Sequence, residues 1–299
     1  MVQIFDVDRS LSVLGDRKQI QKIFGAPPIS LIKDFEIQVK ENNQLIKRSG
    51  MDQHLKQFLM KLFQKEKVTV RNELFGTEDE EIVIRMNEKA RELGLSGIVI
   101  DSISGLGEAV RNDLVRTHRF DMMTRDLWGK YGVRMSNLLT TLRDLPVQLF
   151  LTCHIDRVES DDGVEIEYPA IKGSQKTDSL RWFDVIVYNS VVDGKNYWQV
   201  SQSDSRPFIR TRYPIPEWEG ETYVEPNYLP VLRAYWKSST PLKMLVCGDS
   251  GTGKTYALRT FADYVKSKQD KDKSSKNSKS DANEGSGQSS PDPDGSSGG

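Results

Sequence analysis

The feature that most constrains the fold of this chain is a glycine-rich segment near its C-terminal end. Residues 248–255 read Gly-Asp-Ser-Gly-Thr-Gly-Lys-Thr and fit the pattern G-x-x-x-x-G-K-[ST] without a mismatch. The apolar run over residues 244–247 predicts a strand before the segment, and the apolar spacing over residues 257–265 predicts a helix after it. Because a strand, a loop and a helix in this order form a phosphate-binding loop, the segment predicts a site for a nucleoside triphosphate.

The position of this loop restricts the topology. A phosphate-binding loop normally opens a parallel α/β sheet, but residues 266–299 are mostly Ser, Lys, Gly, Asp and Pro and cannot bury a core. The other strands must therefore come from earlier segments. We expect residues 1–265 to form one circularly permuted domain, whose last strand inserts into the middle of a sheet made by earlier segments. Residues 266–299 are predicted to be a disordered low-complexity tail.

Five apolar runs predict the strands of that sheet. They cover Val2–Val7, Gly97–Asp101, Val147–Cys153, Val185–Tyr188 and Lys243–Cys247. Continuous apolar runs are typical of strands buried on both faces, as in parallel sheets. Apolar spacing predicts helices over Glu78–Leu93, with Gly94 as a C-terminal cap, and over Trp128–Leu142 with its apolar side chains in the core.

Two Asp-Gly pairs, at residues 162–163 and 193–194, predict tight hairpin turns. The expected fold is α/β, with a mainly parallel central sheet flanked by helices, in circularly permuted order, and with a β-hairpin extension on the C-terminal side.

Composition narrows the class of protein. The net charge of −1 gives no overall basic field for a nucleic acid, so such a partner would have to bind local patches. Cys153 and Cys247 both end apolar runs, which predicts buried core residues in a reducing compartment. The sequence shows no secretion signal and no apolar stretch of about 20 residues, so we expect a cytoplasmic protein.

The loop and one strand end supply the predicted nucleotide and metal ligands. Lys254 would reach the β and γ phosphates, and the hydroxyl of Thr255 would hold Mg²⁺. Asp101 ends an apolar strand and is predicted as a second magnesium ligand, with a helix cap as the alternative. The predicted nucleotide contacts are Gly248, Asp249, Ser250, Gly251, Thr252, Gly253, Lys254, Thr255 and Tyr256.

Hydrolysis requires a carboxylate that positions the attacking water. Asp8 is the leading candidate, Asp6 is the alternative, and a turn or cap is the structural interpretation of both. His154 ends the run Phe150–His154 and is predicted to sense the γ-phosphate. It could equally be a hydrogen-bonded residue at a strand end.

These residues resemble the RecA-like ATPase core. Gly97–Leu106 resembles the magnesium strand of that family, and Val2–Asp8 resembles the strand that delivers its catalytic glutamate. Phe150–His154 resembles the strand that ends in a γ-phosphate-sensing amide. Asp8 replaces the family's glutamate and His154 replaces its amide, so both positions depart from the pattern.

A narrower resemblance is to small phage-encoded RecA-core ATPases that act in single-strand annealing and recombination. It covers nearly the whole of residues 1–265 in rotated order. The segments that carry it are Pro241–Val246, Trp128–Gly132, Leu142–Val147, Pro169–Gly173 and Trp182–Val185.

The resemblance implies an ATPase that uses ATP and Mg²⁺ and acts on single-stranded DNA. It implies a homo-oligomer with ATP between subunits, a bacterial host cytoplasm and, as a further partner, a single-strand-binding protein. DNA-binding loops would match residues 102–119 and 156–179. The basic residues there are Arg111, Arg116, Arg119, Arg157, Lys172 and Lys176, for each of which ordinary surface charge is the alternative.

Two other functions and one role stay open. The chain could be a hexameric helicase or packaging motor, or a nucleotide-switched scaffold that does not hydrolyse ATP. Candidates for a cationic finger inserted into a neighbouring subunit's site are Arg210, Arg212 and Lys176.

Overall fold

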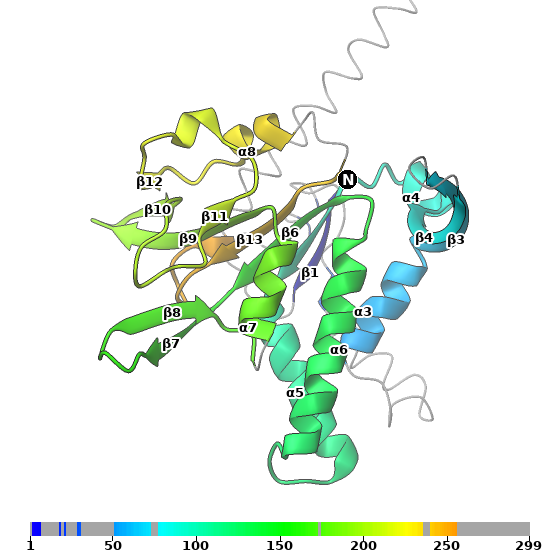
Figure 1. Ribbon diagram of the computed structural model, residues 1–299, viewed down its shortest axis with the longest axis horizontal. Helices are drawn as coiled ribbons and strands as arrows, with labels where there is room; N and C mark the ends of the chain where they lie inside the picture. The colour runs from blue at the N-terminus through cyan, green and yellow to red at the C-terminus, as the bar shows by residue number, and fades with distance from the viewer. Residues whose placement is uncertain are drawn as a thin grey trace, which may run out of the picture.

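A mixed β-sheet lies at the centre of the computed structural model, with helices on both of its faces (Figure 1). The structure describes residues 2–6, 18, 21, 29–30, 51–72, 77–172, 175–235 and 240–255. Its architecture is α/β, as the sequence predicts. None of the helices in these ranges combines the length and the apolar character needed to cross a membrane.

Nine strands of the described chain form the central sheet. Its main path runs β12-β10-β9-β13-β6-β5-β1-β2, and β11 pairs with β9. The segment from β2 to β9 is parallel, and β10, β11 and β12 join antiparallel. The strands are β1 (Val2–Asp6), β2 (Ile29–Ser30), β5 (Gly97–Asp101), β6 (Gln148–Cys153), β9 (Val185–Val192), β10 (Lys195–Gln199), β11 (Arg210–Thr211), β12 (Tyr223–Val224) and β13 (Lys243–Cys247).

The strand before the glycine loop lies inside the sheet. β13 is the last strand in the described part of the chain, yet it pairs in parallel with β6 on one side and β9 on the other. All five of its residues are buried, as its continuous apolar run predicts. The predicted strands are confirmed to within one residue, except that β9 continues to Val192 as the first strand of a hairpin.

Alternate residues of the strands point into two separate apolar cores. Ile98 and Ile100 pack with the helices α3 (Met51–Met60), α5 (Ile103–His118) and α6 (Arg125–Arg143). Val99 packs on the other face with α8 (Tyr228–Tyr235) and the short η3 (Pro216–Trp218). This two-residue period is what a strand covered on both faces requires.

The predicted helix over Trp128–Leu142 is confirmed as α6. The hydroxyl of Thr124 accepts a hydrogen bond from the backbone N–H of Leu127 and caps the first turn. Tyr131 and Leu142 are buried as predicted. Trp128 is 38% exposed, so the first residue of the predicted apolar stripe lies partly outside the core.

The predicted helix over Glu78–Leu93 is wrong. Residues 77–86 form β4 (Thr77–Met86), which pairs with β3 (Phe63–Asn72) as an antiparallel ribbon, and only α4 (Glu88–Glu92) is helical. The β-branched run over residues 82–84 favours a strand once a partner is present. Ion pairs cross the ribbon, such as the one between Lys67 and Glu80 at 2.8 Å. Gly94 does end α4, with φ of 60°.

Both predicted hairpins are confirmed. Asp193 and Gly194 have φ of 50° and 73°, as a primed turn between β9 and β10 requires. The pair at residues 162–163 joins β7 (Ile155–Glu159) to β8 (Glu165–Pro169), a separate two-stranded ribbon. The remaining short helices are α7 (Gln175–Asp178) and η2 (Ser179–Trp182).

Candidate phosphate-loop site

The glycine loop begins at the carboxyl end of β13, where residues of β6, β9 and β10 lie close to its backbone. The N–H of Gly248 donates to the carbonyl of Cys153 at 3.1 Å. A Cβ atom at Gly248 would lie 2.6 Å from the carbonyl oxygen of Asn189, and one at Gly253 would lie 2.7 Å from Nδ2 of Asn196. Gly253 also has φ of 81°, which favours glycine. Gly248 is therefore required by the approach of the β9 backbone, and Gly253 by its own backbone conformation.

Lys254 lies folded over its own loop. Its side chain is buried, and its Nζ donates to the carbonyls of Gly248 at 2.8 Å and Asp249 at 2.7 Å. Burial lowers the pKa of Lys254, and the negative charge of Asp101 opposes that shift. An ammonium group has three donors, so one remains for a ligand oxygen.

Asp101 brings the ends of three strands together. One carboxylate oxygen, Oδ2, accepts a hydrogen bond from the hydroxyl of Thr255 at 2.8 Å, and Oδ1 accepts one from Thr152 of β6. Asp101 is 3% exposed. The following residue, Ser102, caps α5 by accepting from the N–H of Gly105 at 3.1 Å. The cap that we considered for Asp101 is thus supplied by Ser102, which leaves the carboxylate directed at the loop.

His154 follows β6 beside the point where the loop begins. Its backbone N–H donates to the hydroxyl of Ser104 at 2.9 Å, and that hydroxyl lies 3.2 Å from Sγ of Cys153. Cys153 and Cys247 are free and fully buried, as predicted, and the structure shows that they are register partners in the β13–β6 pair. Burial and the hydrogen bond with Cys153 raise the pKa of the Cys247 thiol. Both cysteines are therefore core residues beneath the loop.

Two predicted site residues lie outside the described residues: Asp8 and Tyr256. The backbone of Asp6 ends β1 and is the register partner of Asp101 in the parallel pair β1–β5. The carboxyl end of β1 therefore lies at the same edge of the sheet as the loop.

The first predicted DNA-binding region is a helix rather than a loop. Residues 103–118 form α5. Arg111 pairs with Glu108 within the helix, and Arg116 pairs with Asp113 at 3.1 Å. Arg119 has φ of 56° and forms the C-cap.

The second predicted DNA-binding region is mostly the β7–β8 ribbon, and its basic residues have acidic partners. Arg157 contacts Glu165, Glu167 and Asp249, and Lys172 lies 2.6 Å from Asp156. The side chain of Lys176 lies outside the described residues.

The two arginines suggested as cationic fingers are engaged within the chain. Arg210 donates to the backbone carbonyls of Leu180 and Phe183, the latter at 3.2 Å. Arg212 lies 2.9 Å from a carboxylate oxygen of Asp184.

Three polar residues around the loop were not predicted. The amide of Asn189 is fully buried and donates to the carbonyl of Thr252, while Thr152 and Tyr188 reach Asp101 and Asp249. Thr152 interrupts an apolar strand run, which is a signal that could have marked it. Asn189 directly follows an apolar strand run, and a polar residue at that position could also have marked it.

The acidic and hydroxyl oxygens at this edge suit a hard cation. In the described ranges no three His, Cys, Asp or Glu side chains gather as a metal site. Asp101 and Thr255 together offer a carboxylate and a hydroxyl, and Mg²⁺ commonly takes one or two protein oxygens beside phosphate and water. Comparisons with protein-family models, curated proteins and solved structures find no match for this chain.

Proposed function

We propose that this protein binds and hydrolyses ATP on a RecA-like core whose strands occur in circularly permuted order. The observation that carries the proposal is the hydrogen bond between Thr255 and Asp101, made beside the buried Lys254. It brings a motif hydroxyl next to a strand-end carboxylate that lies 154 residues away in the chain. A helix cap would not require this contact.

The sheet order supports the same proposal. β13 lies in the interior of the parallel segment, and the loop, Asp101 and His154 all lie at carboxyl ends of its strands. Ligands of open α/β sheets bind at that edge. In the resemblance, the strand before the loop comes first and the strands around it follow, whereas here it comes last.

Each residue has a defined part in this proposal. The N–H groups of the loop and the free donor of Lys254 bind phosphate oxygens. Thr255 and Asp101 hold Mg²⁺, which neutralises charge on the phosphate oxygens when bound. Asp8 positions the attacking water, and His154 links the end of β6 to the γ-phosphate. Because aspartate is shorter than the family's glutamate, we expect slow turnover.

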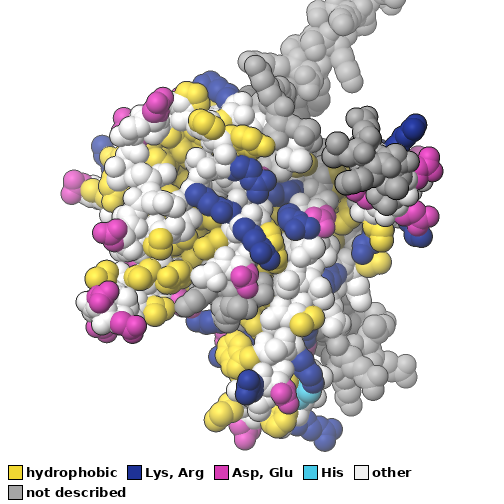
Figure 2. Space-filling view, viewed as in Figure 1, with side chains coloured by type: hydrophobic (Ala, Val, Ile, Leu, Met, Phe, Trp, Pro, Cys, Tyr) yellow, Lys and Arg dark blue, Asp and Glu magenta, His cyan; other side chains and the backbone are white. Residues whose placement is uncertain are grey.

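Single-stranded DNA is the proposed partner, and the α5–α6 turn is the best-placed surface for it. The turn protrudes from the body of the molecule (Figure 1) and presents both basic and apolar side chains (Figure 2). Arg116 is 69% exposed, and the aromatic rings of Phe120 and Trp128 are 49% and 38% exposed. Exposed aromatics among basic residues suit base stacking and phosphate contact.

The test of the ATPase is turnover by the purified protein with and without an oligo-dT strand. Replacing Lys254 with alanine should abolish turnover while the circular dichroism spectrum stays unchanged. Absence of ATP binding by the wild type, or full turnover by Lys254→Ala, would overturn the site assignment.

The test of the DNA partner is fluorescence anisotropy of a labelled oligo-dT at increasing salt. We expect Phe120→Ala to weaken binding and turnover stimulation together, with intrinsic turnover unchanged. ATP-driven unwinding of duplex DNA would instead favour the motor. ATP turnover that does not change when single-stranded DNA is added would remove DNA from the proposal.

A further inference from the structure

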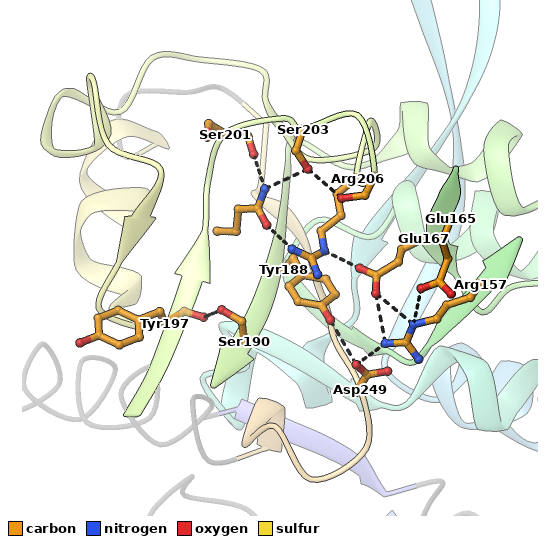
Figure 3. Close-up of polar contacts among 12 residues, drawn as sticks. Arg157, Glu165, Glu167, Tyr188, Ser190, Tyr197, Ser201, Ser203, Arg206 and Asp249 are labelled. Carbon is orange, nitrogen blue, oxygen red and sulfur yellow. Dashed lines mark hydrogen bonds and ion pairs between the residues drawn. The ribbon is translucent and has the colours of Figure 1, made fainter. Parts of the chain in front are cut away.

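Arg157 joins the β7–β8 ribbon to the phosphate loop (Figure 3). Its Nη2 lies 2.6 Å from Oδ2 of Asp249, the second residue of the loop, and the hydroxyl of Tyr188 donates to the same oxygen at 3.2 Å. Arg157 and Asp249 are 92 residues apart in the chain. This ion pair therefore links two segments whose contact depends on the folded structure.

The guanidinium of Arg157 is also held by the second strand of its own ribbon. It lies 3.2 Å from Glu165 and 3.1 Å from Glu167. Glu167 is buried and pairs in turn with Arg206, whose guanidinium lies 3.8 Å from the centre of the Tyr188 ring. The contact is thus part of a network, and networks order side chains better than isolated surface ion pairs do.

Arg157 supplies the positive charge of an otherwise acidic ribbon. It is the only basic residue among residues 155–169, which include six acidic residues. Burial by itself raises the pKa of Asp249, but the hydrogen bond and charge of Arg157 outweigh it and hold that pKa below its usual value. Asp249 is therefore ionised on the loop where phosphate is proposed to bind. An unneutralised carboxylate there would repel the nucleotide.

We infer that Arg157 is a positioning residue for the phosphate loop rather than a DNA contact. It neutralises Asp249 and fastens the β7–β8 ribbon to the loop, so that nucleotide binding and the position of the ribbon are coupled. This inference rests on the proposed ATP site. It assigns the β7–β8 ribbon the part of an arm that responds to nucleotide binding.

A double-mutant cycle on nucleotide affinity tests the neutralisation. The probe is a fluorescent ATP analogue with Mg²⁺, titrated into Arg157→Gln, Asp249→Asn and the double variant. We expect Arg157→Gln to weaken binding about tenfold, because Asp249 loses its counter-charge. The double variant should bind more tightly than Arg157→Gln alone, because removing the charge of Asp249 removes the need for its counter-charge, so the two effects do not add.

The matched control is Arg233→Gln. Arg233 of α8 is 70% exposed and pairs with Glu217 of η3 at 3.5 Å, away from this network, so affinity should not change. Unchanged affinity in Arg157→Gln would overturn the inference and leave the ATP site standing. If the wild type fails to bind the analogue, the proposed function falls and this inference falls with it.

A nitroxide label on Asp161→Cys tests the fastening. Cys153 and Cys247 are fully buried, so labelling of the folded protein should be confined to the exposed residue 161. We expect ATP and Mg²⁺ to change the label's mobility in the wild-type background but not with Arg157→Gln. Without nucleotide, Arg157→Gln and Asp249→Asn should both loosen the label. Identical spectra in all three backgrounds would overturn the coupling.

Discussion

Lys243 and Lys254 stand at opposite ends of β13 and its loop, and both are almost fully buried. Each ammonium group donates to two backbone carbonyls, and burial lowers the pKa of both. The acceptors differ. Lys254 contacts carbonyls five and six residues earlier, in its own loop, whereas Lys243 contacts Leu145 and Val147, 98 and 96 residues away.

This difference separates a ligand group from a structural one. The amino end of β13 is tied to the rest of the sheet from several directions, because the N–H of Lys243 also donates to Asp184 at 2.9 Å. At the carboxyl end, the ammonium group of Lys254 donates to carbonyls of its own loop, so it can exchange a carbonyl for a phosphate oxygen without disturbing the sheet. Although both lysines are buried to a similar extent, we expect Lys254 to bind ligand and Lys243 to stabilise the sheet.

Replacing each lysine with methionine should give the largest contrast. We expect Lys254→Met to reduce ATP turnover about 1000-fold and to change the free energy of unfolding by less than about 1 kcal/mol. Lys243→Met should keep turnover but lose about 2 kcal/mol, because two buried carbonyls lose their donor. Turnover assays and urea unfolding measure both. A large stability loss in Lys254→Met alone would reverse the comparison.

Two buried aspartates extend this contrast between site and scaffold. Asp101 faces the loop, whereas Asp113 pairs with Arg134 at 2.8 Å and Arg116 at 3.1 Å. Asp101→Asn should reduce Mg²⁺-dependent turnover about 100-fold, since a magnesium ligand is lost. Asp113→Asn should lower the free energy of unfolding by about 2 kcal/mol and leave turnover alone. If the two variants behaved alike, Asp101 would be structural.

The pH dependence of stability tests the Lys243 end directly. Burial lowers the pKa of Lys243 to about 8 in the folded state, against about 10.4 for an unfolded chain. Between these values the unfolded state binds more protons, so stability rises with pH. Relative to Lys243→Met, the wild type should gain about 2 kcal/mol between about pH 7.5 and about pH 9.5. A constant difference across that range would mean that Lys243 keeps an ordinary pKa.

Local patterns predicted the loop end of β13 well and the other end poorly. The spacing of the loop motif lies within eight residues, so Lys254 and Thr255 could be read directly, and Asp101 ends a clear apolar run. The burial of Lys243 depends on carbonyls from a distant segment, which no local pattern announces.

Distant partners also explain the other differences from the sequence prediction. The apolar spacing over residues 78–93 predicted a helix, whereas residues 77–86 form β4 by pairing with the distant residues of β3. No local pattern reveals the contact between Arg157 and Asp249, because the two residues are 92 positions apart in the chain. The proposed catalytic Asp8 lies outside the described residues and stays a prediction.

The smallest predicted effects come from two amide side chains, one at each end of β13. Gln148 accepts a hydrogen bond from the N–H of Leu242 at 2.8 Å, before the strand begins, and Asn189 donates to Thr252 in the loop. Gln148→Ala should lower the free energy of unfolding by about 1 kcal/mol without affecting nucleotide affinity. Asn189→Ala should weaken affinity about fivefold, because the loop loses a contact that holds its backbone in place. Equal losses of stability, with affinity unchanged in both, would mean that the loop is held by the sheet as rigidly as the strand is, and that the two ends of β13 do not differ in kind.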